Sequence, residues 1–138
     1  MRYDKIMPCK GSGLLAGKGG YMDLNTILVL QNAGVDTEGA LRRFSGNSGL
    51  YERFLTKFLS DPTFQDVTNA FEAEDTQAAL TSTHTFKGLT ANLGLTRLYG
   101  ISSEMVDCIR GDKFAEASGK YGELKKAYDE ICEILSKA

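Results

Sequence analysis

Apolar residues recur at helical spacing along most of the chain. From residue 23 onward they return every three or four positions, which places them on one face of successive helices. No segment alternates polar and apolar residues for long enough to predict a strand. The clearest stripe lies near the end of the chain and consists of Phe114, Ala117, Tyr121, Leu124, Tyr128, Ile131 and Leu135. The pattern predicts an all-α protein in which amphipathic helices with short loops form an antiparallel bundle.

Capping and helix-ending residues divide this pattern into separate helices. Asp36, Asp75 and Asp112 stand where an aspartate caps the start of a helix. Gly94 is placed to end the helix that Asp75 begins. The remaining apolar faces are expected at Leu24, Ile27, Leu28 and Leu30; at Leu50, Phe54, Leu55, Phe58 and Leu59; at Phe64, Val67 and Phe71; and at Leu95, Leu98, Met105 and Ile109.

The beginning of the chain has a different character. The stretch KGSGLLAGKGG is rich in glycine and lacks a helical period. We therefore predict a flexible leader over residues 1–22 and a single helical bundle over residues 23–138.

Two partial nucleotide-binding motifs lie in this leader. Residues 11–16 fit G-x-G-x-x-A, but no strand precedes them. Residues 12–19 resemble a P-loop, but Ser12 replaces its first glycine and Gly19 stands where a serine or threonine must hold magnesium. Neither motif predicts a nucleotide site, and no cofactor is expected.

Composition narrows the range of functions. The net charge of −2 gives no electrostatic reason to expect binding to nucleic acid or to an acidic membrane surface. No apolar run is long enough to span a bilayer, and no secretory signal is evident. The three cysteines (Cys9, Cys108 and Cys132) are widely spaced, and only one histidine is available to join them, so no metal site is predicted. These features favour a cytoplasmic protein with reduced thiols.

The chemistry-bearing residues gather in the stretch THTFKGLTANLGL. His84 is the only histidine in the chain, and Lys87 and Gly88 follow it by three and four residues. In a helix those spacings place both residues on the histidine's side, one turn further on. Glycine inside a helix costs about 1 kcal/mol relative to alanine, which suggests that another molecule approaches closely there. Lys87 places a cation beside any anion that is attached to the ring.

Several roles for His84 remain open on the local residues alone. A general base would need a nucleophile and an orienting carboxylate, which the nearby sequence does not supply. A metal ligand would need companions that are also missing. A covalent nucleophile needs only an accessible neutral nitrogen and a cation that stabilises the product. The simplest alternative is a histidine at the margin of the core with no chemical role.

The sequence around His84 resembles the signature of histidine-containing phosphotransfer (HPt) domains, H-x-L-K-G-x-x-x-N-L-G. His84, Lys87, Gly88 and the Asn-Leu-Gly of residues 92–94 fit it, and Phe86 replaces the usual leucine. Upstream, GALRRFSGNSGLYERFLTKFLSD is similar to a second family segment, ALxRFxGNxxLYxxxLxxF. The two motifs stand in the family's order and spacing, and the resemblance extends over residues 23–135.

The resemblance implies a four-helix bundle with a short N-terminal helical extension packed against it. It implies a phosphorelay intermediate of a two-component system. In that role His84 takes a phosphoryl group from an aspartyl phosphate on the receiver domain of a hybrid histidine kinase. It then passes the group to a receiver aspartate of a response regulator. Lys87 would stabilise the phosphoryl group and Gly88 would leave room for the receiver. Such a carrier is not an enzyme with ATP-dependent kinase activity of its own.

One position departs from the family pattern. Many members carry Gln or Glu on the next helix, bonded to the second ring nitrogen of the histidine, and this chain has Met105-Val106-Asp107 in that register. Asp107, Ser102 or Ser103 is expected to take that place. The alternative function is a docking module that binds a receiver or kinase domain without carrying phosphate. The basic residues Arg42, Arg43, Arg53 and Lys57 are expected to form a solvated face.

Overall fold

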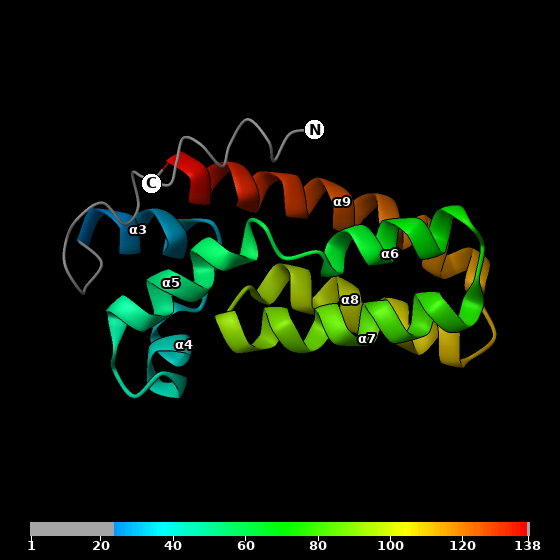
Figure 1. Ribbon diagram of the computed structural model, residues 1–138, viewed down its shortest axis with the longest axis horizontal. Helices are drawn as coiled ribbons and strands as arrows, with labels where there is room; N and C mark the ends of the chain where they lie inside the picture. The colour runs from blue at the N-terminus through cyan, green and yellow to red at the C-terminus, as the bar shows by residue number, and fades with distance from the viewer. Residues whose placement is uncertain (1–23, 138) are drawn as a thin grey trace. The chain divides into compact units, whose positions relative to one another are not determined.

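Seven helices occupy residues 24–137, the part of the 138-residue chain that the computed structural model describes (Figure 1). No extended strand occurs in this part of the chain, so the prediction of an all-α fold is confirmed. In chain order the helices are α3 (Leu24–Asn32), α4 (Thr37–Arg43), α5 (Ser48–Phe58), α6 (Thr63–Glu72), α7 (Thr76–Leu93), α8 (Thr96–Arg110) and α9 (Phe114–Lys137).

The predicted leader over residues 1–22 lies outside the described residues, as do its two partial nucleotide-binding motifs and Cys9. The described helices fall into two compact units. The first unit takes in residues 24–61, 92–94 and 129–137, and the second unit takes in residues 62–91 and 95–128. Helices α7 and α9 therefore contribute residues to both units.

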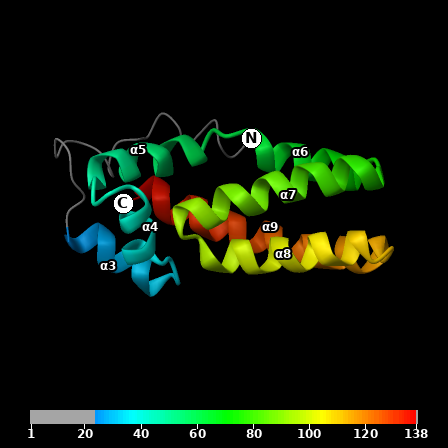
Figure 2. The same cartoon turned by 90° about the horizontal axis from the view of Figure 1, so that it is seen from below.

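The second unit is an antiparallel four-helix bundle made of α6, most of α7, α8 and the first part of α9. The segments that join these helices have only two or three residues, at 73–75, 94–95 and 111–113. Connections this short make consecutive helices run antiparallel. In both ribbon views α6 lies beside α7, and α8 lies beside the first part of α9 (Figures 1 and 2).

Aromatic side chains fill the centre of the second unit. The rings of Phe64 and Tyr128 stack with centroids 3.9 Å apart, which joins α6 to α9. Phe86 of α7 contacts both of them, at 5.4 Å from Phe64 and 5.9 Å from Tyr128. At the other end of α6, Phe71 lies 5.2 Å from Phe114 of α9. Such pairs stabilise the bundle by about 0.5–1.5 kcal/mol each beyond the area that they bury.

Most of the apolar faces predicted from periodicity are buried. On α9 the buried positions include Ala117, Leu124, Tyr128, Ile131 and Leu135, five of the seven residues of the predicted stripe. The stripe of α8 is confirmed in the same way. Leu95, Leu98, Met105 and Ile109 are all at most 5% exposed.

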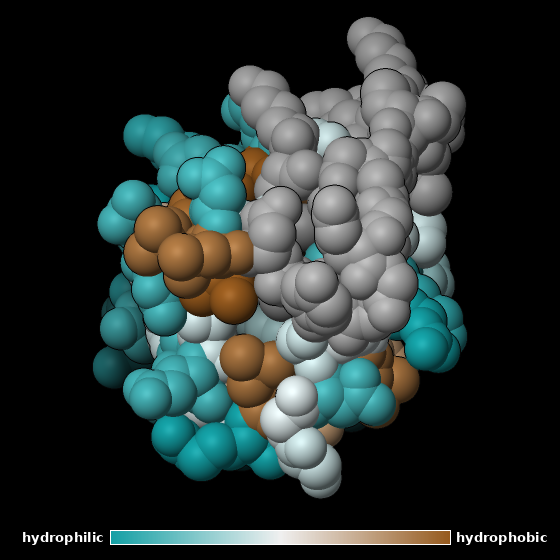
Figure 3. Space-filling model, turned by 90° about the vertical axis from the view of Figure 1, so that its left-hand side faces the viewer, coloured by the Kyte–Doolittle hydropathy of each residue, from teal (hydrophilic) through white to brown (hydrophobic). Residues whose placement is uncertain are grey.

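The first helix is an exception, as is Phe54 of α5, which is 39% exposed. Leu24 and Leu28 of α3 are 69% and 48% exposed, so their assignment to a buried face is wrong. The buried pair on this helix is Thr26 and Leu30, four residues apart and therefore on one face, while Leu24 and Leu28 lie on another. Figure 3 views the molecule from the side on which Figure 1 draws α3, and it shows hydrophobic side chains at the surface there.

Two of the three predicted helix caps are confirmed, and the third is wrong. The carboxylate of Asp36 accepts a hydrogen bond from Gly39 N and that of Asp75 accepts one from Ala78 N, as capping residues do. Asp112 was wrongly placed as the cap of α9. It has a positive φ of 65° and ends α8, because the next amide, Lys113 N, reaches back to the carbonyl of Cys108 at 2.8 Å.

Candidate functional site

Helix α7 is held in the second unit by one face and leaves another face open. Phe86 and Ala79 are at most 1% exposed, and the hydroxyl-bearing Thr83 and Thr90 are fully buried on the same side. His84 and Gly88, four residues apart, are both exposed. The apolar face thus fixes the helix, and the opposite face presents the histidine to solvent.

The imidazole of His84 has no fixed partner within the described part of the chain. No hydrogen bond or ion pair to another described residue involves this side chain. No group of His, Cys, Asp and Glu among the described residues is arranged to hold a metal ion. An exposed ring without competing contacts is available for attack on an incoming electrophile.

Lys87 lies on the same helix, one turn beyond His84. Its Nζ atom is 6.0 Å from the centroid of the Tyr99 ring on α8, at the edge of cation–π range. The lysine is partly buried and Tyr99 is 39% exposed. No described carboxylate pairs with Lys87, so its charge is available to an anion that binds nearby. The sequence analysis missed Tyr99, because its closeness to Lys87 depends on how α7 and α8 pack.

Gly88 is open on the side where a side chain would project. A Cβ atom built at this position would meet no atom within 4 Å. The missing side chain is therefore not required by packing among the described residues. This distinguishes Gly88 from glycines that allow two segments of backbone to touch.

The structure does not identify an orienting residue for the ring. Of the three predicted substitutes, Ser102 is fully buried and its Oγ has no hydrogen-bond partner in the described part of the chain. Ser103 is partly buried and Asp107 is exposed, and neither bonds to His84. The residue that orients the second ring nitrogen therefore stays a prediction.

The last residues of the His84 motif belong to the first unit and have a different role. The carbonyls of Asn92, Leu93 and Gly94 accept hydrogen bonds from Arg43 Nε at 3.2 Å, from the Tyr51 hydroxyl at 2.8 Å and from Asp36 N at 2.8 Å. The last carbonyls of a helix have no partner within the helix, so the bonds to Asn92 and Leu93 satisfy two of them, and the third bond satisfies the residue that follows α7. Arg43 and Tyr51 come from the upstream motif, which thus connects α4 and α5 to the end of α7.

Burial keeps the Tyr51 hydroxyl a donor. The side chain is 0% exposed, and this burial raises the pKa of its phenol well above the usual range. The positive charge of Arg43 lowers the pKa of Tyr51 by a smaller amount, and the carboxylate of Asp36 raises it further. The phenol is therefore protonated under ordinary conditions and donates to the Leu93 carbonyl.

Comparison with known proteins identifies the family. The family model of the Hpt domain matches residues 53–134, which is more than half of the chain. The protein belongs to the Hpt domain family, and the resemblance inferred from its two motifs is confirmed.

The chain is also similar to part of a phosphorelay protein. The chain is 31% identical over 71 residues to the phosphorelay intermediate protein rdeA of Dictyostelium discoideum. The match covers 51% of this chain and 28% of the relative, so it spans less than a third of that protein's length. No solved structure matches the chain. Within residues 24–137, no helix combines the length and the apolar character needed to cross a bilayer.

Proposed function

We propose that this protein is a phosphorelay intermediate that carries a phosphoryl group on His84. The group comes from an aspartyl phosphate on the receiver domain of a hybrid histidine kinase and goes to the receiver aspartate of a response regulator. The observation that carries the proposal is the exposed ring of His84, which has no partner among the described residues, beside the open surface at Gly88.

The transfer step requires little of the protein itself. A ring nitrogen of neutral His84 attacks phosphorus; the N–P bond forms as the P–O bond to the aspartate breaks, and the aspartate leaves as a carboxylate. Lys87 places a positive charge one turn away, where it offsets the charge of the bound phosphoryl group. Gly88 leaves the ring accessible to a receiver. In the transfer to the second receiver, a carboxylate oxygen of the new aspartate attacks phosphorus. The P–O bond forms as the N–P bond breaks, and His84 leaves as neutral imidazole.

The proposal is tested with receiver domains from the same genome, labelled on aspartate by acetyl phosphate. Label should move to this protein and should be acid-labile and alkali-stable, as a phosphoramidate is. His84→Gln should abolish the label and keep the helical circular dichroism spectrum. Label that persists in His84→Gln would rule out His84 as the carrier.

Lys87 is tested against a matched lysine. Lys87→Ala should shorten the lifetime of the phosphohistidine or slow its formation, by about tenfold if one charge-assisted contact is lost. Lys126→Ala removes an exposed lysine of α9 and should change neither rate. Equal rates in both variants would remove Lys87 from the site.

The absence of kinase activity is tested separately. Incubated alone with ATP and magnesium, the protein should acquire no label, since the proposal assigns the phosphoryl supply to a receiver. Self-labelling in a pure preparation would contradict a passive carrier. If receivers bind the protein and no label ever moves, the docking-module alternative holds instead.

A further inference from the structure

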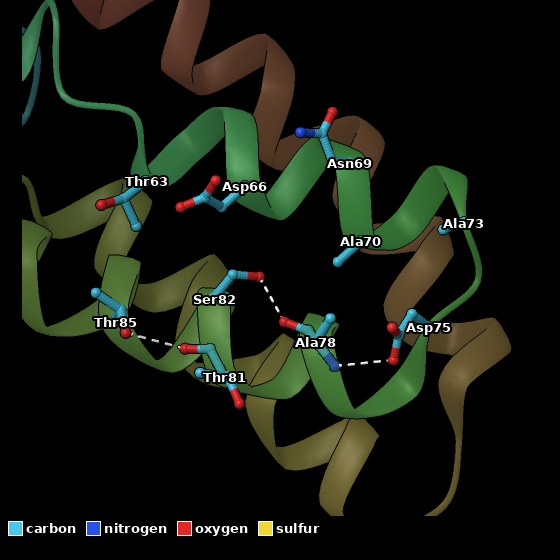
Figure 4. Close-up of a pocket in the computed structure, with 10 residues that line it drawn as sticks. All are labelled: Thr63, Asp66, Asn69, Ala70, Ala73, Asp75, Ala78, Thr81, Ser82 and Thr85. Atoms are coloured by element: carbon cyan, nitrogen blue, oxygen red, sulfur yellow. Dashed lines mark hydrogen bonds between the residues drawn. The ribbon is translucent and has the colours of Figure 1, made fainter.

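A groove runs between α6 and α7 on one flank of His84. It has a volume of about 480 Å³ and lies wholly within the second unit. Small side chains such as Ala78 and Ser82 line it, and they leave room for an incoming side chain between the two helices (Figure 4). Thr81 and Thr85, three residues before and one residue after His84, belong to the same wall. His84 is not part of the lining, but its neighbours on α7 are, so the groove lies next to the face that carries the histidine.

Two hydroxyls that line this groove already use their protons within α7. The hydroxyl of Ser82 donates to the carbonyl of Ala78 at 2.8 Å, and that of Thr85 donates to the carbonyl of Thr81 at 3.0 Å. Each of these hydroxyls has a single proton, so only oxygen lone pairs remain for a ligand. The groove is suited to a ligand that donates hydrogen bonds.

The charge of the groove has the same sign throughout. Its lining includes the carboxylates of Asp66 and Asp75 and no lysine or arginine. Asp75 is partly used, because one of its oxygens caps α7 through Ala78 N. The carboxylate of Asp66 has no partner among the described residues, and it projects from the side of α6 that faces α7 (Figure 4). A cationic donor group would complement both the charge and the hydrogen-bonding capacity of this wall.

We propose that this groove recognises a segment of the phosphoryl-exchange partner that carries an arginine or lysine, and that Asp66 pairs with that basic side chain. The proposal rests on the proposed function for the identity of the partner. It adds a determinant of specificity that lies on the α6 side of His84. The Lys87 ammonium lies instead against Tyr99 of α8.

The test separates binding from chemistry. Affinities of the His84→Gln protein for purified receiver domains are measured by calorimetry, and transfer rates are measured with the same receivers in a His84 background. Asp66→Lys should weaken binding at least about tenfold, and Asp66→Asn should weaken it less and reduce its dependence on salt. Glu123→Lys, the same charge change at an exposed site on α9 outside the groove, is the matched control.

Filling the groove gives a second test that does not depend on charge. Ala78→Leu places bulk between α6 and α7 and should lower receiver affinity by a similar factor. Ala115→Leu, at an exposed position of α9, is its control. Potassium phosphoramidate is a donor too small to need docking. It should label His84 equally in every groove and control variant that retains His84.

The outcomes distinguish failure of the groove proposal from failure of the carrier function. Affinities and rates of Asp66→Lys and Ala78→Leu that equal those of their controls overturn the groove proposal and leave the carrier function intact. If phosphoramidate and receivers both fail to label wild-type protein, the carrier function is wrong. The calorimetric comparison still decides the groove, because it requires no phosphoryl transfer.

Discussion

The His84 motif contains two regions of α7 that use their residues in opposite ways. Around His84 the surface is open: the ring has no described partner, and Gly88 faces empty space. At residues 92–94 each carbonyl accepts a hydrogen bond from a residue distant in sequence. A single short motif therefore combines an exposed segment with a helix end that is bonded to distant residues.

The two glycines of the motif show the difference most directly. Gly94 has a φ of +76°, and a Cβ atom there would lie 2.5 Å from the carbonyl oxygen of Asp36. Gly88 has neither constraint. Identical residues six positions apart thus allow close packing at one site and leave the surface open at the other. The same motif therefore holds one glycine that packing requires and one that it does not.

The largest expected effect comes from Gly94→Ala. A left-handed backbone costs a residue with a side chain about 1–2 kcal/mol, and the collision with the Asp36 carbonyl adds to it. We expect the free energy of unfolding to fall by about 2–4 kcal/mol, measured by urea denaturation. A loss below about 1 kcal/mol would mean that the end of α7 is not anchored as described.

Tyr51→Phe should have the next largest effect. It leaves the Leu93 carbonyl without the Tyr51 donor, which costs about 1–3 kcal/mol in a buried setting. The pH dependence gives a second signature. Because folding raises the pKa of this phenol above its ordinary value of 10.0, the native state holds a proton that the unfolded state releases above that pH.

The contribution of Tyr51 to stability should therefore be complete below about pH 10 and be lost as pH rises beyond it, by up to about 1.4 kcal/mol per pH unit. Unfolding curves of wild type and Tyr51→Phe at about pH 9 and about pH 11 measure it. The difference between the two proteins should shrink at the higher pH. A constant difference would contradict the buried donor.

Gly88→Ala should act in the opposite direction from Gly94→Ala. Alanine favours the helix by up to about 1 kcal/mol, and its Cβ meets no described atom. The midpoint of thermal unfolding should hold or rise. A lower midpoint would show that Gly88 serves packing, which would erase the contrast between the two glycines.

The smallest effect is expected at Tyr99. Tyr99→Leu removes the ring beside the Lys87 ammonium, a contact worth about 0.5–1 kcal/mol at an exposed site. Tyr99→Phe keeps the ring and is the matched control. Stability should fall slightly in the leucine variant and stay unchanged in the phenylalanine variant. Equal stabilities in the two variants would show that the ring does not hold Lys87.

Local features were predictable because they depend on residues close in sequence. The caps at Asp36 and Asp75 are set by amides three residues away. The placement of His84, Lys87 and Gly88 on one side of α7 follows from helical spacing alone. Asn47, which accepts from Leu50 N and caps α5, follows the same rule and could have been found in the GNSG stretch.

Long-range features were not predictable in this way. Tyr51 and Leu93 are 42 residues apart, and Arg43 and Asn92 are 49 residues apart. No spacing rule connects such pairs, and the periodicity that placed Leu24 and Leu28 on a buried face was insufficient because a neighbour must be present to cover them.

By itself, the sequence determined the helical class, the caps and the side of α7 that carries His84, because hydrogen bonds and periodicity within one helix depend only on neighbouring residues. Only the tertiary structure decided which glycine is crowded and which is open. It also decided which carbonyls at the end of α7 are bonded, where the ammonium of Lys87 rests, and that an acidic groove adjoins the histidine. Those properties depend on side chains that packing brings together from distant parts of the chain.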